Sequence, residues 1–135
     1  MNESKIKKIY FKEKVIAFLF NSNEISKTEF VSDPNDFFQL GLGSIKDKVC
    51  LEPHIHNKID RNINKTSEFI FVVNGRMDIE ILAQDGTFVS SVAIKAGYGF
   101  LQYFGGHKIT IHANTQYFEL KQGPYLGHAF DKAIV

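Results

Sequence analysis

Two histidines separated by one residue are the first feature of this sequence that could do chemistry. On an extended strand, His54 and His56 would point to the same face, about 6.5–7 Å apart along the chain and close enough to share one metal ion. Cys50 and Glu52 would lie on the same face of such a strand as the two histidines. Because Pro53 cannot donate to a sheet ladder, we expect this strand to be irregular or to lie at an edge. Two neighbouring surface histidines are the alternative interpretation of the same pair.

Two further potential ligands lie downstream. Glu68 opens an apolar segment that ends at an Asn-Gly pair, a strong signal for a hairpin turn. His107 follows two glycines and shares its parity with Ile109 and Ile111, which predicts that it points inward. An inward histidine can also be a core residue bonded to a carbonyl group, and this interpretation stays open.

These positions resemble the metal-binding motifs of the cupin family. The first cupin motif reads G(X)5HXH(X)3–4E(X)6G, and its last four fixed positions are occupied here by His54, His56, Glu68 and Gly75. His107 resembles the histidine of the second motif. Lys48 stands in place of the leading glycine, and eleven residues, 57–67, separate the second histidine from the glutamate. Their polar, aperiodic composition predicts a surface loop, and lengthening a loop between paired strands costs little entropy.

The C-terminal segment resembles a narrower group within that family. Residues 118–125 read FELKQGPY and are followed by Asp131 and Lys132, similar to the FEVKEGPY…DK ending of the WbuC-type cupin metalloproteins. Those proteins are associated with bacterial surface-polysaccharide clusters. The resemblance extends from about residue 54 to the C-terminus. It implies a jelly-roll barrel, also called a double-stranded β-helix, that holds one divalent metal ion on His54, His56, Glu68 and His107.

The chemistry of this ligand set is consistent with a transition metal. Three imidazoles and one carboxylate suit Fe(II), Mn(II), Ni(II) or Zn(II) rather than Ca(II). The leading hypothesis is a cytoplasmic protein that binds or transforms a sugar or nucleotide sugar, and the resemblance implies the sugar. If the protein is catalytic, the metal would act as a Lewis acid in an isomerisation or epimerisation. A non-catalytic binding or sensing barrel and an Fe(II)-dependent dioxygenase are the alternatives. No residue is assigned a catalytic role.

Four other side chains are predicted to line a pocket: Glu52, Tyr103, Glu119 and Lys121. Each also has an ordinary structural interpretation. An exposed position is common for Glu52, and a satisfied core hydroxyl is common for Tyr103. Glu119 and Lys121 share a strand face, and parity does not decide between a pocket and a solvated surface.

The elements that must position these residues are short strands. Apolar, β-branched and aromatic runs alternate with turns, which predicts an all-β sandwich or barrel. Residues 33–36, with a proline in second place, predict at most a short helical turn. The segment 68–73 is apolar on both faces, so it needs cover from another part of the chain or from the partner in a homodimer. The expected strands are residues 8–20, 28–31, 39–44, 68–73, 76–83 and 87–94.

Composition limits the remaining possibilities. The 135 residues are 44% hydrophobic and 23% charged, with a net charge of +1, which predicts one globular domain over residues 1–135. The balanced charge favours neither nucleic acid nor an anionic membrane as a partner. The apolar run 15–20 is too short to span a bilayer, and one cysteine, Cys50, fits a reducing cytoplasm. Neither a phosphate-binding glycine loop nor a Gly-x-Ser-x-Gly motif is present.

Overall fold

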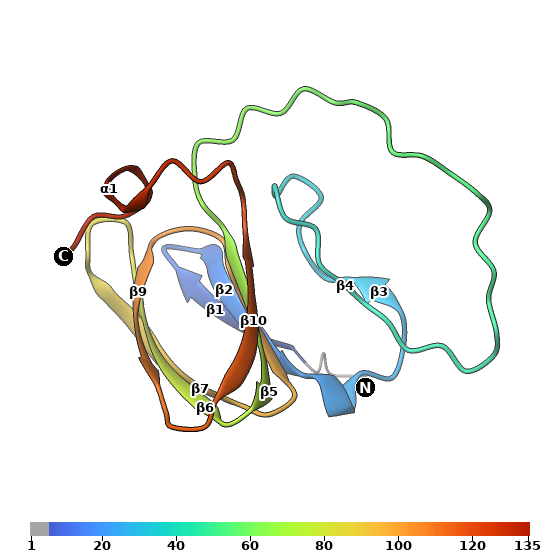
Figure 1. Cartoon of the computed structure of the whole chain (residues 1–135), viewed down its shortest axis with the longest axis horizontal. Helices are drawn as coiled ribbons and strands as arrows, with labels where there is room; N and C mark the ends of the chain where they lie inside the picture. The colour runs from blue at the N-terminus through green and yellow to red at the C-terminus, as the bar shows by residue number, and fades with distance from the viewer. Residues whose placement is uncertain (1–5) are drawn as a thin grey trace.

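The computed structural model describes residues 6–135 and shows an all-β fold whose strands pair antiparallel (Figure 1). The strands are β1 Ile6–Phe11, β2 Lys14–Asn21, β3 Glu29–Phe30, β4 Gly41–Leu42, β5 Glu68–Asn74, β6 Arg76–Leu82, β7 Phe88–Lys95, β8 Tyr98–Gln102, β9 Gly106–Ile111 and β10 Gln116–Lys121. A 3-10 turn, η1, covers Ser22–Glu24, and a one-turn helix, α1, covers His128–Asp131. No helix within residues 6–135 is long and apolar enough to cross a membrane.

Two larger sheets enclose the core. The order in one is β1-β2-β8-β5-β10 and in the other β7-β6-β9, while β3 and β4 form a small separate pair. The predicted period of two in β6 is confirmed, because Met77, Ile79 and Ile81 are buried while Asp78 and Glu80 are partly exposed. The core between the two sheets is formed by side chains such as Ile16, Ile70, Val72, Met77, Ile79 and Ile94.

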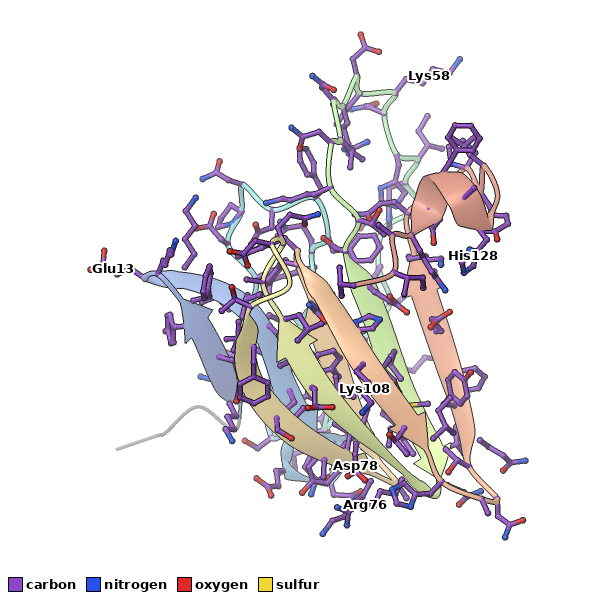
Figure 2. All side chains as sticks on the ribbon, turned by 90° about the vertical axis from the view of Figure 1, so that its left-hand side faces the viewer. Glu13, Lys58, Arg76, Asp78, Lys108 and His128 are labelled. Carbon is purple, nitrogen blue, oxygen red and sulfur yellow. The ribbon has the colours of Figure 1, made fainter. Side chains whose placement is uncertain are left out.

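The outer face of the smaller sheet is charged. Asp78 accepts a hydrogen bond from the Arg76 side chain, and its carboxylate lies 2.6 Å from His112 Nε2. Lys108 Nζ lies 3.6 Å from a carboxylate oxygen of Glu80. Figure 2 shows Arg76, Asp78 and Lys108 on this face. These charged residues form the solvent-facing side of β6 and β9.

The Asn-Gly pair after β5 does not form the expected hairpin. β5 pairs with β8 and β10, whereas β6 pairs with β7 and β9, so the chain crosses from one sheet to the other at this point. Only Gly75 of the pair has a positive φ, and a side chain there would collide with Thr115. The positive φ requires glycine at this tight crossing. In the sequence, an Asn-Gly pair at such a crossing looks the same as an Asn-Gly pair in a type I′ hairpin turn.

The expected strand 8–20 is two strands. β1 and β2 form a hairpin whose turn residues, Lys12 and Glu13, both have positive φ. This conformation usually carries Gly, Asn or Asp, and their absence hid the turn in the sequence. The segment 33–36 is a turn rather than a helix, closed by the Asp36 amide donating to the Asp33 carbonyl at 2.9 Å. Among residues 6–135, the one α-helical turn lies near the C-terminus, in α1.

Cover for the second face of β5 comes partly from the same chain. Phe69 packs with Phe18 of β2 and Leu101 of β8, and Val31, Phe38 and Leu40 pack against the same cluster. The more distant part of the same outer face remains open, because Phe118 and Leu120 of β10 are 68% and 63% exposed. Intrachain cover therefore accounts for the start of β5 but not for β10.

Residues 43–67 contain no strand, so the extended segment expected through the two histidines is not formed here. In Figure 1 this long loop swings away from the two sheets between β4 and β5. Within residues 6–135, β9 pairs only with β6 and β10 only with β5, so both are edge strands. The sheets consequently do not close into a barrel in this structure.

Candidate functional site

Charged side chains gather between the sheets, at the end where β5 and β9 begin and β10 ends. Lys121 lies opposite Glu68, and Glu119 lies opposite the buried Ile70 in the β10–β5 pair. His107 lies opposite the buried Ile81 in the β9–β6 pair. Directly opposed residues of an antiparallel pair share one face, so all four polar side chains face the interior. The inward direction predicted for His107 is confirmed.

Glu68 and His107 form the centre of this group. A carboxylate oxygen of Glu68, Oε2, lies 3.5 Å from His107 Nε2, and the two side chains are 16% and 24% exposed. They come from different sheets, since β5 belongs to the larger one and β9 to the smaller. Their proximity is therefore a consequence of the packing of one sheet on the other.

Gln102 determines how the imidazole of His107 is oriented. The Gln102 amide nitrogen donates to the carbonyls of Phe104 and Gly106, at 3.0 and 2.8 Å. Its oxygen therefore faces His107 Nδ1, at 2.9 Å, and accepts a hydrogen bond from the Nδ1–H group. In the neutral imidazole the other nitrogen, Nε2, then carries a lone pair directed at Glu68.

Burial changes the protonation of this group. Burial, followed by the hydrogen bond with Glu119, raises the pKa of Glu68 to about 8. The same hydrogen bond lowers the pKa of Glu119, so near neutral pH Glu68 keeps its proton and donates it to the Glu119 carboxylate. Burial also lowers the pKa of His107. The 3.5 Å contact between Glu68 and His107 is consequently not an ion pair at neutral pH.

The C-terminal tail is fastened beside these residues by Lys121 and Asp131. Lys121 Nζ donates to a carboxylate oxygen of Asp131 at 3.0 Å, and both side chains are partly buried. This hydrogen bond is the main reason why the pKa of Lys121 is raised. The pair connects the end of β10 to α1 and holds the tail across the open end of the sheets.

His54 and His56 lie elsewhere, in the exposed long loop. Their ring centroids are 5.4 Å apart, and the His54 Nδ1 atom lies 2.8 Å from the carbonyl oxygen of Glu52. The four predicted ligands thus form two separate pairs in this structure. Within residues 6–135, no group of three or more His, Cys, Asp or Glu side chains is arranged to hold a metal ion.

The other predicted pocket residues are divided in the same way. Glu119 and Lys121 lie on the inner face of β10, where Glu119 is still exposed, whereas Glu52 lies in the exposed long loop. Tyr103 is buried in the cluster on the outer face of the larger sheet, edge-on to Phe18. Burial raises the pKa of its hydroxyl. Tyr103 is therefore a core residue on the opposite face of the larger sheet from the inner polar group.

The sequence analysis missed Gln102, which the structure places at the centre of the site. Its signal was a single polar residue ending an apolar strand, at the position directly opposite Glu68. Gln102 is only 3% exposed, and a buried polar side chain needs hydrogen-bond partners. Asp131 was present only as part of the family-like ending, and its ion pair with Lys121 depends on the path of the tail.

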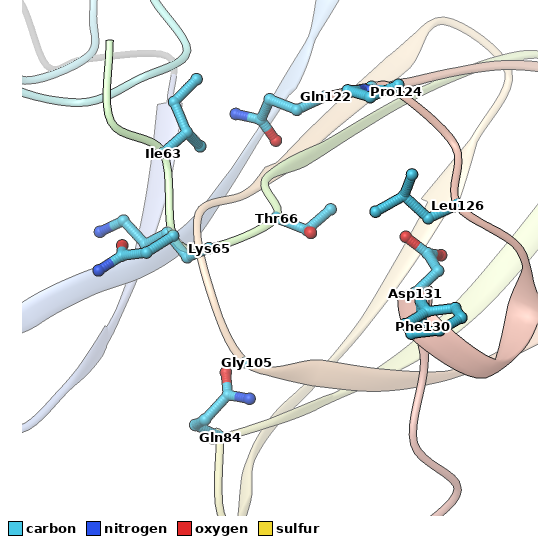
Figure 3. A pocket seen from close by; sticks show the side chains of 12 residues that line it. Ile63, Lys65, Thr66, Gln84, Gly105, Gln122, Pro124, Leu126, Phe130 and Asp131 are labelled. Carbon is cyan, nitrogen blue, oxygen red and sulfur yellow. The ribbon is translucent and has the colours of Figure 1, made fainter.

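A cavity of about 510 Å³ adjoins the inner polar group (Figure 3). One wall is the end of the long loop, including Thr66, and another is the C-terminal tail, including Phe130. Thr66 precedes Glu68 by two residues, Gly105 precedes His107 by two, and Gln122 follows Lys121. The cavity therefore lies just beyond the ends of three strands, β5, β9 and β10, that carry the inner polar side chains.

Comparisons with protein-family models, with curated proteins and with solved structures find no match to this chain.

Proposed function

We propose that this chain is a small metalloprotein of the cupin type, in which Glu68 and His107 hold one divalent ion together with His54 and His56. The observation that carries the proposal is the contact between Glu68 Oε2 and His107 Nε2, 3.5 Å, inside the fold. Two potential ligand atoms converge there, a nitrogen with a free lone pair and a carboxyl oxygen, and a divalent ion bound by both would replace the Glu68 proton.

Gln102 provides the hydrogen-bond acceptor that the second ring nitrogen of a metal-binding histidine usually has. Such a histidine usually donates its second ring N–H to a neighbouring acceptor, which fixes the tautomer and the ring orientation. His107 Nδ1 donates to Gln102 in this manner, so Nε2 is available as a ligand. Loss of a proton from Glu68 on metal binding would add the negative charge that a divalent ion favours.

The two histidines of the long loop belong to a segment with the pattern of an edge strand. In residues 48–56, Val49, Leu51 and Ile55 alternate with Cys50, Glu52 and the histidines, yet those three apolar side chains are exposed. Loops without regular structure rarely exceed about 12–15 residues, and the stretch 43–67 is longer. An exposed amphipathic segment of this length favours addition to a free sheet edge.

The free edge of β9 is the acceptor that suits this segment. Strands pair antiparallel throughout the described chain, and β9 begins beside His107. A segment that pairs antiparallel with β9 would therefore end near His107, and His54 and His56 would be among its last residues. Their side of the segment would face inward with His107, and the added strand would close the open side as in a jelly-roll barrel.

A divalent ion at this place would supply Lewis-acid polarisation of a bound hydroxyl or carbonyl group. We propose a sugar-derived metabolite of surface-polysaccharide synthesis as the ligand, with isomerisation or epimerisation as the reaction if the protein is an enzyme. A binding or sensing barrel would hold the same ligand without turnover. Uptake of oxygen by the iron-loaded protein would favour the dioxygenase alternative instead.

The test is metal content per chain, measured by elemental mass spectrometry after loading with Fe(II), Mn(II), Ni(II) or Zn(II) and removal of excess. We expect close to one ion per chain, lost in His107→Ala and in the double variant His54→Ala, His56→Ala. His112→Ala is the matched control, because His112 pairs with Asp78 on the outer face and should retain the ion. Absence of bound metal in the unaltered protein, or equal loss in the control, would overturn the proposal.

A further inference from the structure

The cavity beside the inner polar group differs from that group in its chemistry. Its polar lining consists mainly of uncharged groups, including Asn64, Thr66, Gln84 and Gln122. The apolar part is formed by Pro124, Leu126 and Phe130 from the tail and by Ile63 from the loop. The volume, about 510 Å³, is within the range of cavities that bind small molecules.

The two charged residues of the cavity are already engaged. Asp131 accepts the hydrogen bond of Lys121, and the Lys65 ammonium lies 5.6 Å from the centre of the Phe104 ring. Their charges are opposite in sign, so the lining carries no net charge that would select an ionic ligand. A ligand held here would be recognised through hydrogen bonds with amides and a hydroxyl and through apolar contact.

Gln122 provides the most specific hydrogen-bonding group. Its side-chain oxygen accepts from the Ser67 backbone N–H at 2.7 Å, which fixes the direction of the amide. Its nitrogen is buried and has no hydrogen-bond partner within residues 6–135. Figure 3 shows this side chain on the loop side of the cavity, between Ile63 and Thr66. A buried donor without a partner is unfavourable, and a small shift toward a ligand oxygen would satisfy it.

Phe130 supplies the apolar part of the site. Phe130 is 83% exposed although it lies in a helical turn that is anchored by the Lys121–Asp131 pair. In Figure 3 the side chains of Leu126 and Phe130 lie together on the tail side of the cavity, across from Gln122. An exposed aromatic ring opposite hydrogen-bonding amides suits a molecule with one apolar face and several hydroxyl groups.

We infer that this cavity binds a neutral, hydroxyl-rich molecule of monosaccharide size, with the Gln122 amide donating to a hydroxyl oxygen and Phe130 covering a C–H face. The inference rests on the proposed function only for the position of the ligand beside the metal ligands; the cavity itself needs no metal. Because α1 and the preceding tail form one wall, the binding site depends on the tail remaining fastened to β10.

The experiment is ligand-observed NMR and calorimetric titration of the full chain, with and without added metal. The probes are glucose, galactose, mannose and N-acetylglucosamine, with glucose 6-phosphate as a charged counterpart. We expect a neutral sugar to bind the metal-free protein, with affinity at least about tenfold lower in Phe130→Ala. Phe118→Ala is the matched control, since Phe118 is similarly exposed but lies on the outer face of β10.

Gln122→Glu tests the donor separately. It keeps an oxygen for the Ser67 N–H and replaces the amide nitrogen by a second oxygen, so a sugar hydroxyl should lose its donor while the fold is retained. Three results would overturn the inference. These are binding of glucose 6-phosphate alone, equal effects of Phe130→Ala and Phe118→Ala, and absence of binding by all probes. Metal content that is normal in Phe130→Ala would show that such a failure concerns the cavity and leaves the metal site intact.

Discussion

The two halves of the predicted ligand set are held in different ways. Glu68 and His107 lie on paired strands of two packed sheets, and Gln102 fixes the imidazole through a hydrogen-bonded amide. His54 and His56 lie in a loop that makes no strand pair, although their rings are close to each other. Spacing along the chain is enough to bring two neighbouring histidines together. Convergence of residues from distant segments requires sheet packing.

The largest effect is expected from a substitution of Gln102, which supports the inner pair of ligands. Gln102→Leu removes the acceptor for His107 Nδ1 and leaves the carbonyls of Phe104 and Gly106 without their donor. We expect a loss of about 1–3 kcal/mol in the free energy of unfolding and about 10–100-fold in metal affinity. Urea denaturation and metal titration measure the two effects. Gln116→Leu, at an exposed position of β10, is the control; an equal effect there would contradict the role of Gln102.

The second prediction concerns the pH dependence of the metal-free protein. The pKa of Glu68 is raised from 4.5 to about 8, so the folded state binds more protons than the unfolded state between these values. Stability contributed by this proton is present at low pH and is lost as pH rises toward 8. The lowered pKa of His107 acts in the opposite direction below pH 6.5, so the decline should be clearest from about pH 6.5 to 8.

Thermal unfolding across this pH interval measures the effect. Glu68→Gln, which keeps a hydrogen-bond donor for Glu119 but does not titrate, should flatten the curve between pH 6.5 and 8. A decline of the same slope in Glu68→Gln would mean that another group is responsible.

A smaller effect is expected where the tail meets β10. Asp131→Asn removes the charge that pairs with Lys121, and we expect a loss of about 1 kcal/mol or less in overall stability. Release of the tail should be more visible than the change in stability, as faster proteolysis of residues 123–135. Lys27→Gln, which removes an exposed ion pair with Glu29, provides a reference. Unchanged proteolysis of Asp131→Asn would show that other contacts hold the tail.

The smallest effect is expected in the long loop. In the metal-free protein, the double variant His54→Ala, His56→Ala should change the free energy of unfolding by less than about 0.5 kcal/mol, because both side chains are exposed. The same substitutions should decrease stability clearly in the presence of the metal, since a ligand stabilises the state to which it binds. A large effect without metal would show that the loop is already paired with the sheets.

Several elements were predictable because their signal is local. The alternation in β6 and the inward direction of His107 follow from a side-chain period of two, and the structure confirms both. The turn at Lys12 and Glu13 was not predictable, because its residues are atypical for the backbone conformation that they adopt. The Asn-Gly pair was recognised as a turn, but its strands join different sheets, which no local pattern encodes.

The sequence by itself determined that the fold is rich in strands and which polar residues are available for a site. It also determined which neighbouring side chains share a strand face with each of them. These properties depend on propensity and on the alternation of neighbouring side chains. Tertiary structure alone decided that Gln102 orients His107, that Glu68 is hydrogen-bonded to Glu119, and that Asp131 fastens the tail. Each of these depends on distances between segments far apart in the chain, and those distances are set by sheet pairing and core packing.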